Sequence, residues 1–414
     1  MTERTDVHIR HAAKRPGHPV LKGITWLVAA TAGFGLVFVQ TYKTQVESHI
    51  TTEDIAPLLG PDRPAAALPP ADGSSGRPVN ILLMGSDDRS GGNAAIGGKN
   101  SGKLNDTTLI LHISADRSRI EVVSIPRDTM VKLSECERSD GSIQKAYSGQ
   151  FNESFGNGAR TTGLNSDGAA CTVRTVESLT DIHIDHYAVI DFVGFVNMVD
   201  AVGGVPMCIP TEYADAYSGT YLSPGPQVLN GPQSVAYVRM RKGINTTGSD
   251  LDRIDRQQEF LKNLASKILS AQMLYRPQDV TNFVKAVADS LTVDEELGSL
   301  DYLAGLAYSL RGLDPSTGIV MSTAPVETYP ADHYRVQFSN KASAMWAAII
   351  ADQPIAPLLD AQSNSPSNAV GADAGTPATG GAAPAIDAGP PATEGAAPAV
   401  DPSSQDGILA ACAS

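Results

Sequence analysis

The middle of the chain alternates short apolar runs with longer amphipathic segments, and this alternation limits the fold more than any other feature. The short runs are rich in β-branched residues and stop at glycine, proline or polar residues, which is typical of strands. They are "VNILLMG" from Val79, "TTLILHIS" from Thr107, "RIEVVSIP" from Arg119 and "IDHYAVID" from Ile184. Segments with helical periodicity lie between or after them, at 171–180, 192–204 and 249–272. This order predicts an α/β/α sandwich, three layers around one mixed central sheet.

The composition divides the chain into parts. Residues 40–77 are polar and then rich in proline and alanine, which is typical of a stalk. Periodic apolar segments fill 78–356, the expected folded domain. From 357 to 414 the chain is rich in alanine, proline, glycine and serine, and we expect this tail to be disordered because it cannot bury enough apolar surface.

The N-terminal part predicts a membrane anchor. Residues 23–39, "GITWLVAATAGFGLVFV", carry no charge and are just long enough to span a bilayer. Residues 1–22 are rich in lysine and arginine, so the positive-inside rule places them in the cytoplasm and everything after Val39 outside. A cleaved signal peptide is the alternative, although "QTYKTQVES" offers no typical cleavage site. A buried core helix is a third interpretation.

Charge and cysteine content narrow the partners and the compartment. The net charge of -14 argues against nucleic acid as the main partner. The four cysteines form no C-x-x-C pair, so a zinc site is not expected, whereas disulfides are allowed outside the cytoplasm. We expect Cys136 to pair with Cys171, and Cys208, between two apolar residues, to be a small buried side chain. The remaining cysteine is Cys412.

Polar residues gather where the expected strands end. "GSDDR" places Asp87 and Arg89 after the first strand, "NDTT" places Asp106 before the second, and "SIPRDT" places Arg127 and Asp128 after the third. In open α/β sheets, ligands favour crevices at strand ends. Carboxylates suit Mg²⁺ and guanidinium groups suit phosphate, so the set indicates a metal–pyrophosphate site. Ordinary ion pairing at loop ends is the alternative.

A second basic cluster supports an anion site. In "YVRMRKGINTTGSDLDRIDRQQ", Arg239 and Arg241 are predicted to share one face of a strand, and Ser249 to cap the next helix. That helix places Arg253 and Gln257 on one face. The alternative is a solvated charged helix.

These motifs, with "IDHYAVIDFVGFVNMVDAVGGV", resemble those of the LytR-CpsA-Psr family over about residues 78–270. The resemblance implies a phosphotransferase that moves a glycopolymer from a polyprenyl-pyrophosphate carrier to a peptidoglycan hydroxyl. It also implies Mg²⁺ at the pyrophosphate and an apolar pocket for the lipid. The folded domain would then be catalytic and lie on the outer face of the cell membrane. "IQKAY" departs from the family pattern at Gln144 and Lys145, which leaves the contacts of that loop open.

The resemblance also implies roles for individual residues. Asp87 and Asp106 hold the metal; Arg127, Arg241 and Asp128 are catalytic, and Asp128 or a metal-side carboxylate takes the hydroxyl proton. The pyrophosphate-binding residues are Arg89, Arg127, Arg239, Arg241, Arg253 and Gln257. A hydrolase of lipid-linked pyrophosphates and a non-catalytic wall-binding protein remain alternatives. The glycopolymer (arabinogalactan, teichoic acid or capsule) is open.

Overall fold

The structure is a computed structural model of the 414-residue chain. It describes residues 40–41, 43–68, 76–87, 103–215, 220–240, 250–268, 277–314, 317–363 and 412, without the side chains of 277–282 and 360–363. The chain divides into two compact units, residues 1–48 and 49–414. In the first unit, residues 43–47 are helical. The expected anchor, 23–39, lies outside the described residues, and none of the helices that are described is long and apolar enough to cross a membrane.

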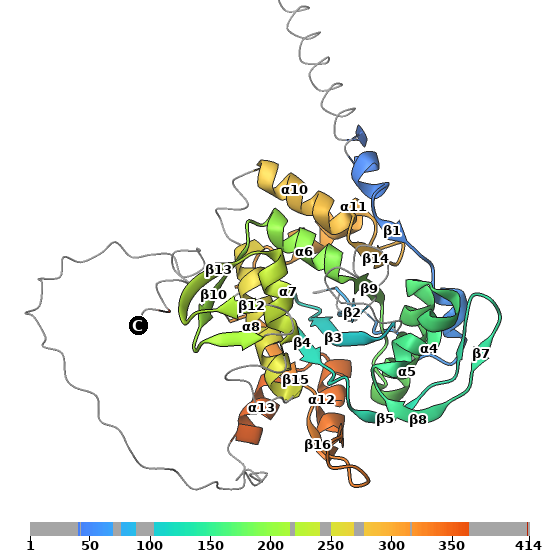
Figure 1. The fold of residues 1–414 in the computed structure, drawn as a ribbon. Coiled ribbons are helices and arrows are strands. Elements are labelled where there is room, and N and C mark those ends of the chain that lie inside the picture. The colour runs from blue at the N-terminus through green and yellow to red at the C-terminus, as the bar shows by residue number, and fades with distance from the viewer. Residues whose placement is uncertain are drawn as a thin grey trace, which may run out of the picture. The chain divides into compact units, whose positions relative to one another are not determined.

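The second unit is built on one seven-stranded mixed sheet (Figure 1). In spatial order its strands are β1 (Thr51–Thr52), β14 (Leu291–Val293), β9 (His186–Ile190), β2 (Val79–Ser86), β3 (Asn105–Ile113), β4 (Ile120–Ser124) and β15 (Ile319–Thr323). All four strands expected from the sequence are present. β3 runs antiparallel to both β2 and β4, whereas β9 is parallel to β2 and β15 is parallel to β4. The carboxyl ends of β2, β4, β9 and β15 therefore meet the amino end of β3 at one edge of the sheet.

Helices cover both faces of this sheet. They are required because apolar side chains of β2 point alternately to the two faces, and both sets are buried. Leu82 and Met84 point into a core shared with α4, α5 and α12, while Val79 and Ile81 point into a core shared with α11. These helices are α4 (Glu153–Thr162), α5 (Asn165–Thr180), α11 (Leu300–Ser309) and α12 (Asn340–Ile350). The expected three layers are therefore present.

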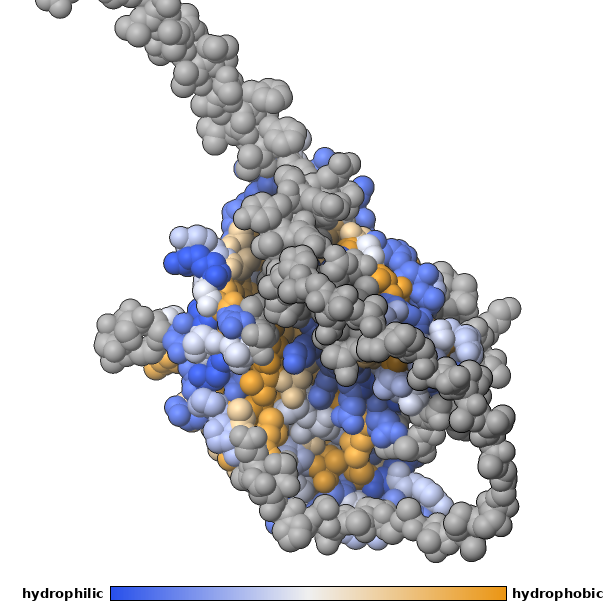
Figure 2. Space-filling view, turned by 90° about the vertical axis from the view of Figure 1, so that its left-hand side faces the viewer, coloured by the Kyte–Doolittle hydropathy of each residue, from blue (hydrophilic) through white to orange (hydrophobic). Residues whose placement is uncertain are grey.

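A third core lies beyond the edge where the strand ends meet. Its buried side chains come from helices and from two-stranded sheets and include Tyr237, Met240 and Phe260. The elements are α6 (Phe192–Ala201), α7 (Gly231–Arg239), α8 (Asp250–Ile268), β10 (Val205–Ile209), β11 (Tyr213–Asp215), β12 (Thr220–Leu222) and β13 (Gly225–Leu229). Hydrophobic surface also runs as a band between hydrophilic side chains on the face seen in Figure 2.

The folded part is longer at both ends than the composition indicates. β1 pairs with β14, and Ile55 and Leu59, next to and within α2 (Ala56–Leu59), are buried in the core of the domain. Residues that we expected in the stalk therefore belong to the folded unit. At the other end, α13 (Ala356–Ser363) continues past residue 356, and its Leu359 packs against the same core. The remaining elements are α10 (Pro277–Ala288), β5 (Met130–Leu133) paired with β8 (Tyr147–Gln150), β6 (Cys136–Glu137) paired with β7 (Ile143–Gln144), and β16 (Val326–Thr328) paired with β17 (Val336–Phe338).

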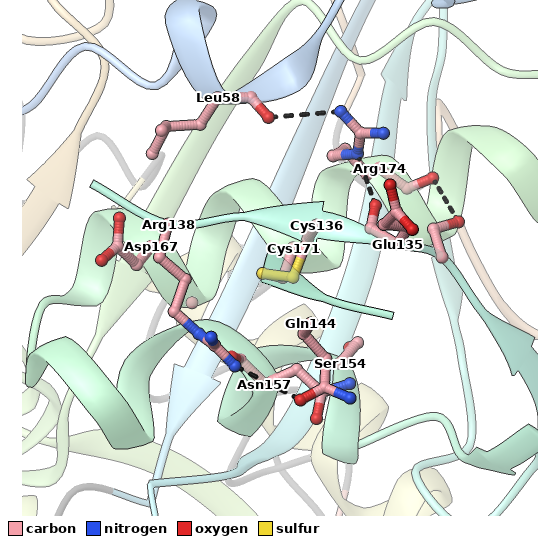
Figure 3. Close-up of a disulfide and its surroundings, with 12 residues drawn as sticks. Leu58, Glu135, Cys136, Arg138, Gln144, Ser154, Asn157, Asp167, Cys171 and Arg174 are labelled. Atoms are coloured by element: carbon pink, nitrogen blue, oxygen red, sulfur yellow. Dashed lines mark hydrogen bonds between the residues drawn. A yellow bond between two sulfur atoms is a disulfide. The ribbon is translucent and has the colours of Figure 1, made fainter. Parts of the chain in front are cut away.

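All four cysteines are in disulfides. Cys136 on β6 pairs with Cys171 on α5, as expected, and Figure 3 shows this bond between the strand and the helix. Arg174 strengthens the same junction, since its Nε donates to the Glu135 carbonyl at 2.8 Å. Cys208 pairs with Cys412, so our interpretation of Cys208 as a small buried side chain is wrong. The apolar neighbours of Cys208 belong to the strand pattern, and nothing local signals a partner 204 residues away.

Candidate active site

Charged residues from separate segments meet at the sheet edge described above. Asp87 follows β2, Asp106 is the second residue of β3, and Arg127 and Asp128 follow β4. Helix α8 is held over the same edge because Gln258 donates to Ser124 Oγ and Thr323 Oγ1, each at 3.1 Å. The strand ends at which we expected a ligand site are thus contacted by helix α8.

Asp106 occupies a β-bulge. Ser86 pairs with Asn105 and Gly85 pairs with Thr107, so Asp106 is the extra residue on β3. A bulge interrupts the strict alternation of a strand and can redirect a side chain. The ladder continues past it, since the Asp87 amide donates to the Leu104 carbonyl at 2.7 Å. The two expected metal-side carboxylates are therefore both carried by this irregular end of the β2–β3 ladder.

The turn that carries Arg127 and Asp128 is fixed by backbone hydrogen bonds. The Asn152 amide donates to the Arg127 carbonyl at 3.1 Å, and the Phe151 amide donates to the Thr129 carbonyl at 2.8 Å. The Thr129 hydroxyl is buried and donates to the Pro126 carbonyl at 2.6 Å. The charged side chains of the turn therefore project from a preorganised backbone.

Arg127 is the centre of the charge cluster. It forms an ion pair with Asp106, and its Nε lies 3.4 Å from Asp250 Oδ1 and 3.6 Å from Asp128 Oδ2. Burial lowers the pKa of Arg127, but these three carboxylates outweigh burial and leave the pKa above its ordinary value. The guanidinium stays charged and available to a phosphate.

Helix α8 adds a second buried guanidinium at its first turn. Arg253 is only 3% exposed; its terminal nitrogen lies 2.9 Å from Asp250 Oδ1 in an ion pair and donates to the Asp106 carbonyl at 3.1 Å. Burial lowers the pKa of Arg253 and raises that of Asp250. Among the described residues, Nε of Arg127 and Nε of Arg253 have no hydrogen-bond acceptor. Buried donors of this kind are the groups that an anionic ligand satisfies.

Arg239 lies at the end of helix α7, and not on a strand as we expected. Asn230 and Gln233 form a capping box that stabilises the start of α7. The Arg239 guanidinium lies 4.2 Å above the ring of Phe192 and 3.9 Å from Asp87 Oδ1. The aromatic face and the carboxylate together hold this cation at the sheet edge.

Gln257 and Arg256 hold α8 against α7. Gln257 is buried, and its side-chain nitrogen donates to the Val238 carbonyl at 3.0 Å; Arg256 donates to the Met240 carbonyl. Gln257 therefore contacts the residue before Arg239, and its side-chain nitrogen is already used in a hydrogen bond to the last turn of α7. The other expected site residues, Arg89 and Arg241, and the expected cap Ser249, lie outside the described residues.

Two charged residues at the site, Asp250 and Arg335, had not been expected. Asp250 pairs with Arg127 and Arg253, and Arg335 lies 3.3 Å from Asp128 and donates to Gln150 Oε1 at 2.8 Å. Asp250 resembled an ordinary acidic residue of a first helical turn, and its position three residues before Arg253 was the available signal. Arg335 is 207 residues from Asp128, and no local pattern connects them.

The donor chemistry fits a metal ion that completes its ligands from phosphate. In the described part of the chain, no three acidic, histidine or cysteine side chains form a metal cluster by themselves. Asp87 and Asp106 supply carboxylate oxygens, the ligands that Mg²⁺ prefers, and Mg²⁺ commonly binds through one or two carboxylates plus substrate phosphate. Both carboxylates face arginines, as a metal–phosphate site requires.

Comparisons with known proteins agree with this fold. Cell wall biosynthesis protein LcpA of Corynebacterium glutamicum is 30% identical over 76% of this chain and 61% of its own length. TagV of Bacillus subtilis, a polyisoprenyl-teichoic acid–peptidoglycan teichoic acid transferase, is 27% identical over 61% of this chain and 60% of its own. The chain thus spans about three fifths of the length of these curated relatives. The crystal structure of protein gbs0355 from Streptococcus agalactiae, at 22% identity, has the same fold, with a TM-score of 0.53 over 66% of this chain and 87% of that one.

The family assignment follows from the sequence match and the fold together. The model of the LytR_cpsA_psr family matches residues 36–348, which is well over half of the chain. That range contains the seven-stranded sheet and every charged residue that the structure places at the site. Arg89 and Arg241 also fall within it, although they lie outside the described residues. The chain belongs to the LytR-CpsA-Psr family.

Proposed function

We propose that this protein transfers a glycopolymer from a polyprenyl-pyrophosphate carrier to a sugar hydroxyl of peptidoglycan, forming a phosphodiester. The observation that carries the proposal is the convergence of Arg127, Arg239 and Arg253, from three separate elements, on the carboxylates of one sheet edge. The relative TagV is named as a teichoic acid–peptidoglycan transferase, which supports the same reaction class. Arg89 and Arg241 are proposed to complete the set.

The charges of the site suit a metal pyrophosphate. Around Arg127, Arg239 and Arg253 lie the carboxylates of Asp87, Asp106, Asp128 and Asp250. A bare pyrophosphate would meet repulsion from these carboxylates. A pyrophosphate diester with one Mg²⁺ adds two negative and two positive charges, so the complex enters without changing the net charge. We therefore propose that metal and pyrophosphate bind together.

Asp87 and Asp106 are the proposed holders of Mg²⁺. When bound, the ion supplies charge neutralisation at the phosphate oxygens. Asp106 is ion-paired with Arg127, so this carboxylate would exchange its guanidinium partner when a metal is present. Arg127 would then turn its donors to the phosphate, which is the use that its buried Nε predicts.

The residues of the chain would position the reaction as follows. Asp128 accepts the proton of the sugar hydroxyl, and the hydroxyl oxygen attacks the phosphorus that bears the glycan. A new P–O bond forms, the bond from that phosphorus to the bridging oxygen breaks, and the polyprenyl phosphate leaves. Arg127, Arg239 and Arg253 hold the charge of the leaving phosphate. Such transfer depends mainly on alignment and charge stabilisation, which a partly buried arginine cluster provides.

The location is proposed from the sequence and the disulfides. Residues 23–39 would anchor the chain, and the domain would lie on the outer face of the membrane. Two disulfides suit an oxidising compartment. Protease added to wall-stripped cells should digest the domain and spare an N-terminal tag; a protected domain would contradict this topology.

The function is tested by transfer in vitro. The full chain in detergent, with Mg²⁺, a lipid-pyrophosphate-linked glycan and peptidoglycan, should yield glycan joined to the wall polymer through a phosphodiester. Arg127→Ala should abolish the product. Release of glycan phosphate with no wall-linked product would identify a hydrolase instead, and full cellular function in Arg127→Ala would support a non-catalytic role.

A further inference from the structure

The β16–β17 hairpin reaches the site through Arg335, which lies 3.3 Å from Asp128 Oδ1, whereas Arg127 lies 3.6 Å from Asp128 Oδ2. Thr129 forms a bridge to Val336 on β17, so the hairpin joins the turn that carries Asp128. The base of the hairpin is anchored in the main core, where Phe338 packs edge-on against Trp346 with ring centroids 5.7 Å apart. β17 contacts β5, and Figure 1 shows the hairpin loop projecting from the domain.

The loop of this hairpin, residues 329–335, is ordered by its own hydrogen bonds. The Tyr329 amide donates to the Arg335 carbonyl at 2.9 Å, and the Asp332 amide donates to the Tyr329 carbonyl at 3.1 Å. The Asp332 carboxylate accepts from the Tyr334 amide at 3.0 Å. The side chains of the loop are therefore presented from a defined backbone, which lowers the entropic cost of binding a ligand.

Arg335 connects the loop to the reaction centre. Its terminal nitrogen lies 2.8 Å from Gln150 Oε1 and 3.3 Å from Asp128 Oδ1, while Asp332 lies farther, at 3.9 Å from Nε. Gln150 ends β8, in the part of the domain that the Cys136–Cys171 disulfide fastens to α5. Asp128 therefore has Arg127 on the pyrophosphate side and Arg335 on the hairpin side.

The next residues of the loop present an aromatic surface to solvent. Tyr334 is 84% exposed, and the His333 ring lies against it with centroids 4.0 Å apart. Consecutive Cα atoms lie about 3.8 Å apart, so this surface is next to the residue that touches Asp128. Exposed aromatic rings gain from being covered by an apolar face, and a pyranose ring offers such a face together with hydroxyl groups. The acceptor hydroxyl has to reach Asp128, whose Oδ1 lies near Arg335 of the loop and whose Oδ2 lies near Arg127 of the arginine cluster.

From this juxtaposition we infer that the β16–β17 loop is the acceptor subsite, in which Arg335 positions Asp128 and the Tyr334–His333 pair stacks on a pyranose ring of the peptidoglycan glycan strand. The inference rests on the proposed function for the identity of the reaction. It assigns the donor to the arginine cluster and the acceptor to the hairpin. Arg335 acts through Asp128 and is a positioning residue.

A kinetic test measures KM for the acceptor, peptidoglycan, separately from KM for the lipid-linked donor. In Tyr334→Ala, KM for peptidoglycan should rise about tenfold with KM for the lipid-linked donor unchanged, because only the stacking surface is lost. In Arg335→Met, KM for peptidoglycan should also rise about tenfold, and Arg335→Lys should recover part of the loss. Tyr308 and Arg311 form a matched exposed pair on and just after α11, 4.1 Å apart, and Tyr308→Ala or Arg311→Met should change neither KM. Equal KM for peptidoglycan in the hairpin variants and in these controls would overturn the inference.

A pH profile separates positioning from simple packing. Arg127, Arg253 and Arg335 lower the pKa of Asp128, while burial and Asp250 raise it, and the net pKa is above the ordinary value. Removing Arg335 should raise this pKa further, so the acid limb of kcat should move to higher pH in Arg335→Met. A hairpin that only supports the fold would leave the limb in place.

A binding measurement keeps the inference testable if the full chain proves to have no transferase activity. Disaccharide-peptide fragments released from peptidoglycan by lysozyme are titrated against the full chain. They should bind the wild type and Tyr308→Ala, and bind Tyr334→Ala about tenfold more weakly. Binding with no transfer would refute the proposed function and leave the glycan site standing. Equal binding by wild type and Tyr334→Ala, or none by wild type, would overturn the site itself.

Discussion

The buried pair of Arg253 and Asp250 allows the stability of the site to be separated from its binding. Arg253→Met removes the guanidinium and keeps an apolar stem. The negative charge of the Asp250 carboxylate, whose side chain is 14% exposed, then loses one of its positively charged partners. Breaking a buried ion pair from one side costs about 3–5 kcal/mol. Arg127 remains 3.4 Å from Asp250, so we expect the lower end of this range. At about 2 °C per kcal/mol for a domain of this size, Tm should fall by about 6 °C.

The double variant Arg253→Met/Asp250→Asn should recover most of this loss, because it removes the uncompensated charge as well. The cost of the single variant should also depend on pH. Burial raises the folded pKa of Asp250 above its unfolded value, so the stabilisation from its proton is present at low pH and is lost as pH rises through the folded pKa. Losing Arg253 raises this pKa further, and the penalty should therefore grow with rising pH across that window.

The assay is thermal unfolding of the full chain with Mg²⁺, with and without inorganic pyrophosphate. At a ligand concentration of about 100 times Kd, the wild type should gain about 2.7 kcal/mol, or about 5 °C. Neither the single nor the double variant should gain it. Arg63→Met is the matched control. Arg63 lies outside the site and forms an ion pair with buried Glu177, with 2.6 Å between the two side chains. This variant should have a lower Tm than the wild type but keep the rise in Tm that pyrophosphate causes. A preserved shift in the double variant would refute the arginine clamp, and an unchanged Tm in Arg253→Met would refute the role of the buried pair.

The remaining predictions concern the metal, the general base and the second disulfide. Asp87→Asn and Asp106→Asn should each abolish transfer with little loss of Tm, and EDTA should do the same to the wild type; full activity in EDTA would remove the metal from the mechanism. Transfer should fall on the acid side at a pH above about 3.9, the ordinary pKa of an aspartate, because burial raises the pKa of Asp128; Asp128→Asn should be inactive at every pH tested. Replacing Cys208 and Cys412 by serine should lower the free energy of unfolding by up to about 5 kcal/mol, as expected for closing a loop of 204 residues. A free thiol at Cys412 in the oxidised protein would contradict that pairing.

The sheet and most of its site could be predicted because the relevant signals are local. Each strand is a short apolar run with a stop, and parallel strands must place their carboxyl ends at one edge. This rule places Asp87, Arg127 and Asp128 together, as the structure has them. Asp106 joins them because it lies at the amino end of β3, which runs antiparallel to both neighbours. The bulge at Asp106 has no such signal, because it depends on how β2 and β3 pair and not on either sequence alone.

The error at Arg239 has a physical cause that the sequence contains. Residues 238–241, "VRMR", alternate apolar and basic side chains and follow a valine and a tyrosine, which favours a strand. The preceding "NGPQ" carries a capping box and a proline in the first turn, and both favour the start of a helix. These local signals outweigh the strand propensity of the residues that follow. The helical outcome places Arg239 at a helix end, where the dipole favours a cation.

The two halves of the proposed site are built from different kinds of structure, and this difference has a consequence for specificity. The arginines of the donor half project from strand ends and helices that also form the cores, so their positions cannot change without disturbing packing. Tyr334 and His333 lie on an exposed loop whose substitution disturbs only its own few hydrogen bonds. Arg335 joins the halves, because it belongs to the loop but contacts Asp128 and Gln150. A fold of this design can keep one pyrophosphate chemistry while the hairpin alone is altered to suit a different acceptor sugar.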